Sequence, residues 1–232
     1  MVAAPAPASV PDAIARMQAI DAALPTRDGI AWFTKLYLDV TEAVNEELPR
    51  ATFADPSFMA RLDVTFANLY FAALEAFLAD PATTPRAWAP LFASRRRRRV
   101  APLQFAFAGM NAHINRDLPV ALVATCRASG IDLLRARRQQ RDYLAVNVLL
   151  ERAEAKVKRW FLTGFAGVVD DTLGRDDDRV AMWNVRRARD AAWVNAQTLW
   201  TLAPFPTLQK RFLTTLDRTV GFAGRGLLLP RL

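Results

Sequence analysis

The sequence contains one cysteine, Cys126, and one histidine, His113. A single cysteine excludes an intrachain disulfide and a cysteine-rich zinc site. One histidine and one cysteine cannot supply the nitrogen and sulfur ligands that zinc or copper usually requires, so we assign no metal ligands. The scarcity of cysteine fits a reducing compartment, and we therefore expect a cytoplasmic protein.

Long apolar runs and the common cofactor motifs are also missing. No window reaches the roughly eighteen uninterrupted apolar residues that would indicate a membrane span, so no transmembrane segment is predicted. A phosphate-cradling glycine loop, a dinucleotide fingerprint and a nucleophile elbow are absent, which removes several enzyme classes and leaves the cofactor unknown. The acidic segments 170–171 and 176–178, with Asp63 and Asp117, leave magnesium open. Residues 176–178 are more typical of helix capping.

The charge balance is basic, with 31 Lys and Arg against 23 Asp and Glu and a net charge of +8. Such an excess indicates an anionic partner such as nucleic acid, acidic lipid or an acidic protein. The excess is almost entirely arginine in an alanine-rich chain, which a GC-rich coding sequence would also produce. The run Arg95 to Arg99 lacks interleaved aromatic residues and is more typical of a solvated helix end.

Apolar residues recur at spacings of three and four along most of the chain, which predicts an all-α protein. We expect residues 1–10 to form a disordered tail and residues 11–232 a single helical domain, a compact irregular bundle of about seven helices around a buried central helix. The predicted helices are residues 11–24, 30–48, 55–79, 101–124, 131–162, 179–202 and 207–220.

The predicted central helix, residues 101–124, is apolar around its whole circumference from Phe105 onward, as expected of a helix surrounded by other helices. A band of polar residues interrupts it. We call this set the polar band: Asn111, His113, Asn115, Arg116 and Asp117. A buried polar group without a partner costs roughly 1–3 kcal/mol, so each of these side chains needs a partner from a neighbouring helix or from a ligand.

Helical periodicity divides the polar band into two faces. Asn111 and Asn115 share one side, while His113 and Asp117 share the other and are four residues apart, so their side chains can meet. Asp117 could then fix the tautomer of His113 and raise its basicity, which is half of an acid–base site. Gly109, one turn earlier, leaves room for a ligand or a neighbouring helix, and Pro119 predicts a kink because it cannot donate to the Asn115 carbonyl.

Three segments resemble a family of actinobacterial proteins classed as a domain of unknown function. They are residues 20–29, residues 62–71 and the segment GMNAHINRDLP at residues 109–119, which is the most specific signature and contains the whole polar band. The likeness runs from about residue 17 to residue 200. It implies a helical domain of this length and brings no established activity.

Two functional hypotheses follow. The first is an enzyme, with specialised metabolism as a candidate setting, that binds a small organic substrate in an inter-helix pocket and uses His113 with Asp117 as its acid–base pair. Substrate-positioning residues would be Asn111, Asn115, Arg116, Asp63 and Tyr70. The second is a non-catalytic binding protein whose Arg-rich surface contacts nucleic acid, acidic lipid or an acidic partner. In that case the polar band is a structural network of hydrogen bonds. The enzyme hypothesis requires a cavity beside His113, and the binding-protein hypothesis does not.

Overall fold

The computed structural model describes residues 5–50, 52–163 and 185–230. Within these ranges there are helices and no strand, which confirms the predicted all-α class. The α-helices are α1 (Val10–Ala23), α2 (Gly29–Glu47), α3 (Pro56–Ala79), α4 (Ala89–Ser94), α5 (Pro102–Ala112), α6 (Leu118–Ala128), α7 (Arg137–Thr163), α9 (Val185–Thr201) and α10 (Pro206–Leu227). Short 3₁₀ turns are η1 (Pro81–Thr83) and η3 (Leu133–Arg135), and η2 (His113–Asp117) is a π-helical turn.

Helix starts follow local capping chemistry. Asp55 caps α3 by accepting a hydrogen bond from the Phe58 backbone N–H at 3.1 Å, and Pro56 occupies the first turn, as predicted. Asp28 accepts from the Ile30 N–H at 2.9 Å at the start of α2. The beginning of the predicted helix 179–202 lies outside the described residues, and α9 is described from Val185.

The sequence predicts a disordered tail over residues 1–10, but the last residues of this segment are ordered. Ser9 and Asp12 form a capping box at the start of α1. Pro7 is buried, and its carbonyl accepts a hydrogen bond from the Asn68 side chain at 3.0 Å. The last residues of the segment therefore pack against α3, where the Asn68 side chain supplies the hydrogen bond that the Pro7 carbonyl needs. Residues 1–4 lie outside the described structure.

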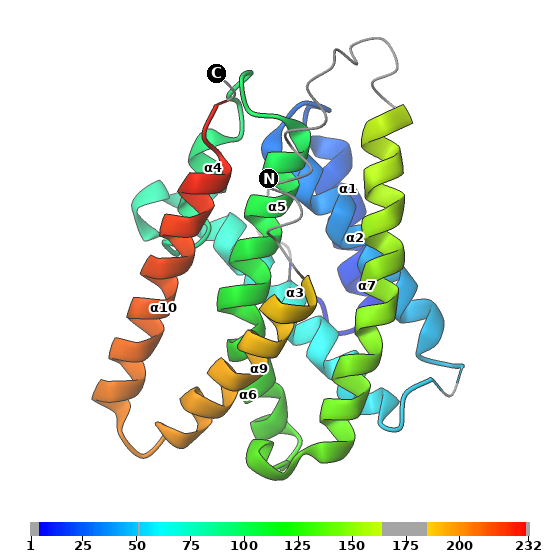
Figure 1. Cartoon of the computed structure of the whole chain (residues 1–232), viewed down its shortest axis with the longest axis vertical. Helices are drawn as coiled ribbons and strands as arrows, with labels where there is room; N and C mark the ends of the chain where they lie inside the picture. The colour runs from blue at the N-terminus through cyan, green and yellow to red at the C-terminus, as the bar shows by residue number, and fades with distance from the viewer. Residues whose placement is uncertain (1–4, 51, 164–184, 231–232) are drawn as a thin grey trace.

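The central helix is continuous from α5 through η2 to α6, which confirms a buried central helix (Figure 1). In Figure 1 it runs vertically through the middle of the molecule, with α10 on one side and α7 on the other. Helices α2 and α10 pack against α5, while α3 and α9 pack against α6. Every residue from Phe105 to Ile114 is buried, in agreement with the apolar circumference of this stretch.

A π-helical turn occupies the place where Pro119 predicts a kink. The Leu118 N–H donates to the carbonyl of His113, five residues back, instead of continuing the α-helical pattern. Pro119 has no N–H to donate to the Asn115 carbonyl, so one α-helical hydrogen bond is missing at this position. The wider π-helical turn rearranges the hydrogen bonds around the missing one. Turns of this kind are often found at functional sites.

Helix α3 is the one described helix that is long and apolar enough to cross a bilayer by length and composition. Core helices of globular proteins pass the same test. Here α3 contacts α1, α4, α6 and α7, and its buried residues include Phe58, Leu62 and Tyr70. Packing inside the bundle buries part of its apolar surface.

Candidate functional site

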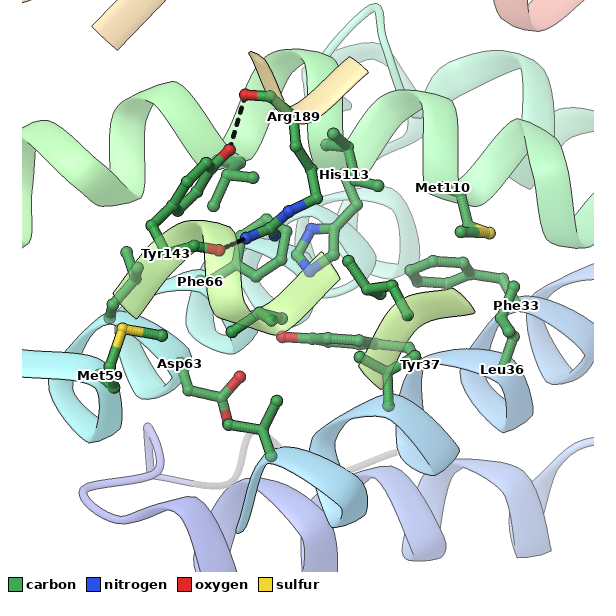
Figure 2. Close-up of a pocket in the computed structure, with 17 residues that line it drawn as sticks. Phe33, Leu36, Tyr37, Met59, Asp63, Phe66, Met110, His113, Tyr143 and Arg189 are labelled. Atoms are coloured by element: carbon green, nitrogen blue, oxygen red, sulfur yellow. Dashed lines mark hydrogen bonds between the residues drawn. The ribbon is translucent and has the colours of Figure 1, made fainter. Parts of the chain in front are cut away.

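A cavity of about 70 Å³ lies beside His113, between α2, α3, α7, α9 and the central helix. One ordered water requires roughly 10–15 Å³, so the space admits more than a single solvent molecule. The walls are mostly aliphatic and aromatic side chains. The polar lining residues are Tyr37, Asp63, His113, Tyr143 and Arg189, and Figure 2 shows that they come from different walls of the cavity.

The two ring nitrogens of His113 have different environments. Nδ1 lies 3.1 Å from Oδ2 of Asp117. Nε2 is buried without a hydrogen-bond partner among the described residues. The ring is stacked on Phe66, with centroids 3.5 Å apart and planes at 6°, and it meets the ring of Tyr37 edge to face at 4.5 Å. The backbone of η2 and these rings fix the imidazole at the cavity wall.

Burial lowers the pKa of His113 below its ordinary value of 6.5, and the hydrogen bond and charge of Asp117 oppose that shift. The imidazole is therefore neutral at pH 7. Since the carboxylate of Asp117 accepts the proton on Nδ1, the lone pair of the neutral ring is on Nε2. A neutral imidazole with an unshared lone pair in a cavity can accept a proton from a bound molecule.

Asp117 is fully buried and held by three donors. Oδ2 also accepts a hydrogen bond from Nε1 of Trp88 at 2.9 Å, and Oδ1 accepts from Arg116 at 2.6 Å. Nε of Arg116 lies 3.5 Å from Asp217 on α10. Asp117 is thus paired with a cation and fixed in orientation, which makes it a positioning residue for His113.

Tyr37 and Asp63 add two unpartnered oxygens. The Tyr37 hydroxyl and Oδ2 of Asp63 are buried, and neither has a hydrogen bond among the described residues. Burial raises the pKa of Asp63 to about 7, and burial with the nearby charge of Asp63 raises the pKa of Tyr37. Tyr37 is therefore a neutral donor at pH 7, while Asp63 exchanges between its acid and its carboxylate near neutrality.

Arg189 brings a positive charge to the same cavity. It is 6% exposed, its Nε donates to Asn147 at 2.7 Å, and one Nη donates to the backbone carbonyl of Tyr143 at 2.5 Å. The Tyr143 hydroxyl donates back to the Arg189 carbonyl at 2.7 Å, and the guanidinium lies 4.0 Å from the centroid of the Tyr143 ring. Helices α7 and α9 therefore position this guanidinium rigidly.

Five of the seven predicted site residues do not line the cavity; one of them, Asp117, is still bonded to His113 there. Asn111 donates to the Val220 carbonyl on α10 at 2.9 Å, and Asn115 donates to Asn111 at 3.1 Å, so this face of the polar band meets α10 as a pair. Tyr70 shares a hydrogen bond of 2.7 Å with Thr34 in the core. Arg116 is engaged with the two aspartates described above. The structure thus brings together His113, Asp117 and Asp63 and directs the others elsewhere.

Gly109 makes room for a neighbouring helix. A Cβ at this position would lie 2.3 Å from the ring of Phe33 on α2. Phe33 in turn contacts His113 edge to face at 5.8 Å. The glycine therefore allows α2 to approach closely enough for its aromatic residues to enclose the imidazole.

Sequence reasoning did not assign Tyr37 or Arg189 to the site. Tyr37 is one of several inward residues of α2, and its role is visible only because its hydroxyl has no partner. Arg189 did leave a signal, because it shares a helical stripe with Val185, Ala192 and Trp193. An arginine on the buried stripe of a helix needs a partner.

No group of three or more metal-ligating side chains gathers in the part of the chain that the structure describes. The acidic segments 170–171 and 176–178, considered for magnesium, lie outside the described residues. Asp63 and Asp117 belong to different hydrogen-bonding environments, as described above. Among the described residues, the cavity presents one base, the unpartnered oxygens of Tyr37 and Asp63, and one cation.

A family model described as a family of unknown function, DUF5995, matches residues 10–230. The chain belongs to this family. No curated protein matches the chain, and no solved structure matches it. Membership in DUF5995 extends over the whole described domain and includes every residue of the cavity. It assigns no activity, so the function of the cavity is argued from its geometry.

Proposed function

We propose that this DUF5995 protein is an enzyme that binds a small organic substrate in the cavity beside His113 and uses Nε2 of His113 to accept a proton from it. The single observation that carries the proposal is the difference between the two ring nitrogens: Nδ1 is bonded to Asp117, and Nε2 is buried at the cavity without a partner. A histidine with a purely structural role is expected to have both nitrogens satisfied.

In this proposal Asp117, Tyr37 and Arg189 have distinct tasks around His113. Asp117 holds the imidazole in the tautomer that leaves Nε2 basic, and its charge stabilises the imidazolium that forms when the proton is taken. The Tyr37 hydroxyl and the guanidinium of Arg189 stabilise negative charge that develops on the substrate. The apolar walls exclude water and strengthen these interactions.

The proposal is tested by screening small organic compounds against the untagged full-length chain by thermal shift. Compounds that raise Tm are then incubated in D₂O with the parent, with His113→Gln and with Asn111→Ala, and turnover or deuterium incorporation is followed by NMR. Loss of a general base lowers the rate by roughly 10²–10⁴-fold, whereas compound binding in the cavity persists.

Asn111→Ala is the matched control, because Asn111 is a buried polar residue of the same helix that bonds to α10 rather than lining the cavity. It should retain the parent rate. Full turnover by His113→Gln, or an equal loss in both variants, would overturn the assignment of His113 as the base.

A further inference from the structure

Among the described residues, Arg189 is a buried cation that forms no ion pair with a carboxylate, and only the charge of its sequence neighbour Asp190 acts on it from nearby. In the described structure no Asp or Glu forms an ion pair with it, and its hydrogen-bond acceptors are neutral: the side chain of Asn147 and the backbone carbonyl of Tyr143. These account for Nε and one Nη, and no described residue accepts a hydrogen bond from the other Nη. Removing a guanidinium from water is costly unless an opposite charge or a full set of acceptors replaces the solvent.

Asp63 is the one carboxylate among the described lining residues that shares the cavity with Arg189, and it does not fill this role. Burial alone raises the pKa of Asp63, whereas a neighbouring guanidinium would lower it. Figure 2 shows Asp63 below the guanidinium of Arg189, with the hydroxyl end of Tyr37 between them and His113 beside Arg189. The positive end of the cavity is therefore separate from the end that carries Asp63.

Resting on the proposed function, we infer that the substrate is a small organic monocarboxylic acid, with its carboxylate bound by Arg189 and its apolar body held against the aromatic and aliphatic walls. A guanidinium binds a carboxylate through parallel hydrogen bonds, and the unused Nη supplies donors for such a contact. The Tyr37 hydroxyl and Nε2 of His113 then face the body of the acid, where the proton is removed.

A carboxylate fits this cavity better than a phosphate. Among the described lining residues Arg189 is the only cation, so it balances the one charge of a bound carboxylate, whereas a phosphate dianion brings a second charge before any proton is removed. Neither His113 nor Arg189 stands at a helix start, since His113 lies within the continuous central helix and Arg189 follows the first described turn of α9. The volume of about 70 Å³ also favours a small molecule.

The test compares acids with their neutral amides on the untagged full-length chain. The probes are butanoate, hexanoate and benzoate, each paired with the amide of the same carbon skeleton. Binding is measured by calorimetry and by the imidazole NMR signals of His113, the only histidine in the chain. We expect at least one acid to shift these signals and to bind at least tenfold more tightly than its amide, and Arg189→Met to remove that preference.

Arg189→Lys keeps the positive charge and serves as a second variant in case Arg189→Met does not fold. It should retain part of the preference for acids over amides. If amides bind as tightly as acids, if no acid binds, or if a folded Arg189→Met variant keeps the preference, the carboxylate assignment is wrong. The tautomer of His113 in the free protein is read from the same samples. An imidazole with unprotonated Nε2 and equal binding of acid and amide would remove this inference and leave the proposed function standing.

Discussion

Nδ1 of His113 and Oδ2 of Asp117 lie 3.1 Å apart across a π-helical turn, and Trp88 donates to the same carboxylate oxygen at 2.9 Å. Because Arg116 holds the other oxygen, the carboxylate cannot rotate away from the imidazole without breaking several bonds. The orientation of His113 is therefore set by a buried group that does not itself line the cavity.

Asp117→Asn should strongly destabilise the protein and change the tautomer of His113. The amide removes one of the two carboxylates that Arg116 contacts and leaves Asp217 at 3.5 Å, and breaking a buried ion pair in this way costs up to about 3–5 kcal/mol. Urea unfolding measures the loss. Asp132→Asn is the control, because the side chain of Asp132 is 47% exposed, and its free energy of unfolding should stay within about 0.5 kcal/mol of the parent. Equal effects of the two substitutions would contradict this account of Asp117.

Gly109→Ala should destabilise the protein by roughly 1–3 kcal/mol, because the added Cβ would meet the ring of Phe33 at 2.3 Å. Gly226→Ala provides the matched control. Gly226 also lies in a helix, and a Cβ there meets nothing within 4 Å, so this change should be neutral or stabilising by up to about 1 kcal/mol. Thermal unfolding of both variants decides the point, and a neutral Gly109→Ala would show that α2 does not depend on close approach at this glycine.

Asp63→Asn should stabilise the protein at high pH and not at low pH. Burial raises the pKa of Asp63 from 3.8 to about 7, so the folded protein binds this proton more tightly than the unfolded chain and loses stability as pH rises from about 4 to 7. Asparagine does not ionise. The stability difference between variant and parent should therefore grow over this range to about 1–3 kcal/mol at pH 8.

The comparison also separates Asp63 from His113, whose pKa is shifted in the other direction. A lowered pKa at His113 makes the folded state lose stability as pH falls below 6.5, and both proteins share that contribution. The contribution of His113 therefore cancels in the stability difference between Asp63→Asn and the parent. A stability difference that is independent of pH between 4 and 8, measured by urea unfolding, would show that Asp63 is not buried as described.

The fold was largely predictable from the sequence, because helical periodicity and capping residues are local signals. Asp55 with Pro56 marked the start of α3, and the apolar circumference after Phe105 marked the central helix. The π turn was not predictable in form, since Pro119 signals only that an α-helical bond is missing. Ser9 as the cap of α1 was also missed, because Pro11 suggested a later start.

Apart from Asp63 on α3, the site was predictable only where its residues share one helix. Spacing alone placed His113 beside Asp117 and put the Asn111 and Asn115 pair on a different face. The contributions of Tyr37 and Arg189 depend on how α2 and α9 dock against the central helix, which periodicity does not specify. Trp88 bonds to Asp117 from outside any predicted helix, and no local pattern could pair residues 29 positions apart.

Asn111→Ala tests the division of the polar band directly. It leaves the Val220 carbonyl on α10 without its donor and should cost roughly 1–3 kcal/mol of stability. The imidazole signals of His113 should remain at their parent positions, because Asn111 bonds to α10 and does not line the cavity. Movement of those signals in the folded variant would mean that the two faces form one network.

The most direct test of the central claim is the tautomer and pKa of His113, measured by ¹H–¹⁵N NMR of the untagged chain across the pH range. With a single histidine, the imidazole signals have one source. The account predicts a neutral ring at pH 7 with the proton on Nδ1, an unprotonated Nε2 and a pKa below 6.5. A ring protonated on Nε2 at pH 7, or a pKa above 6.5, would contradict it.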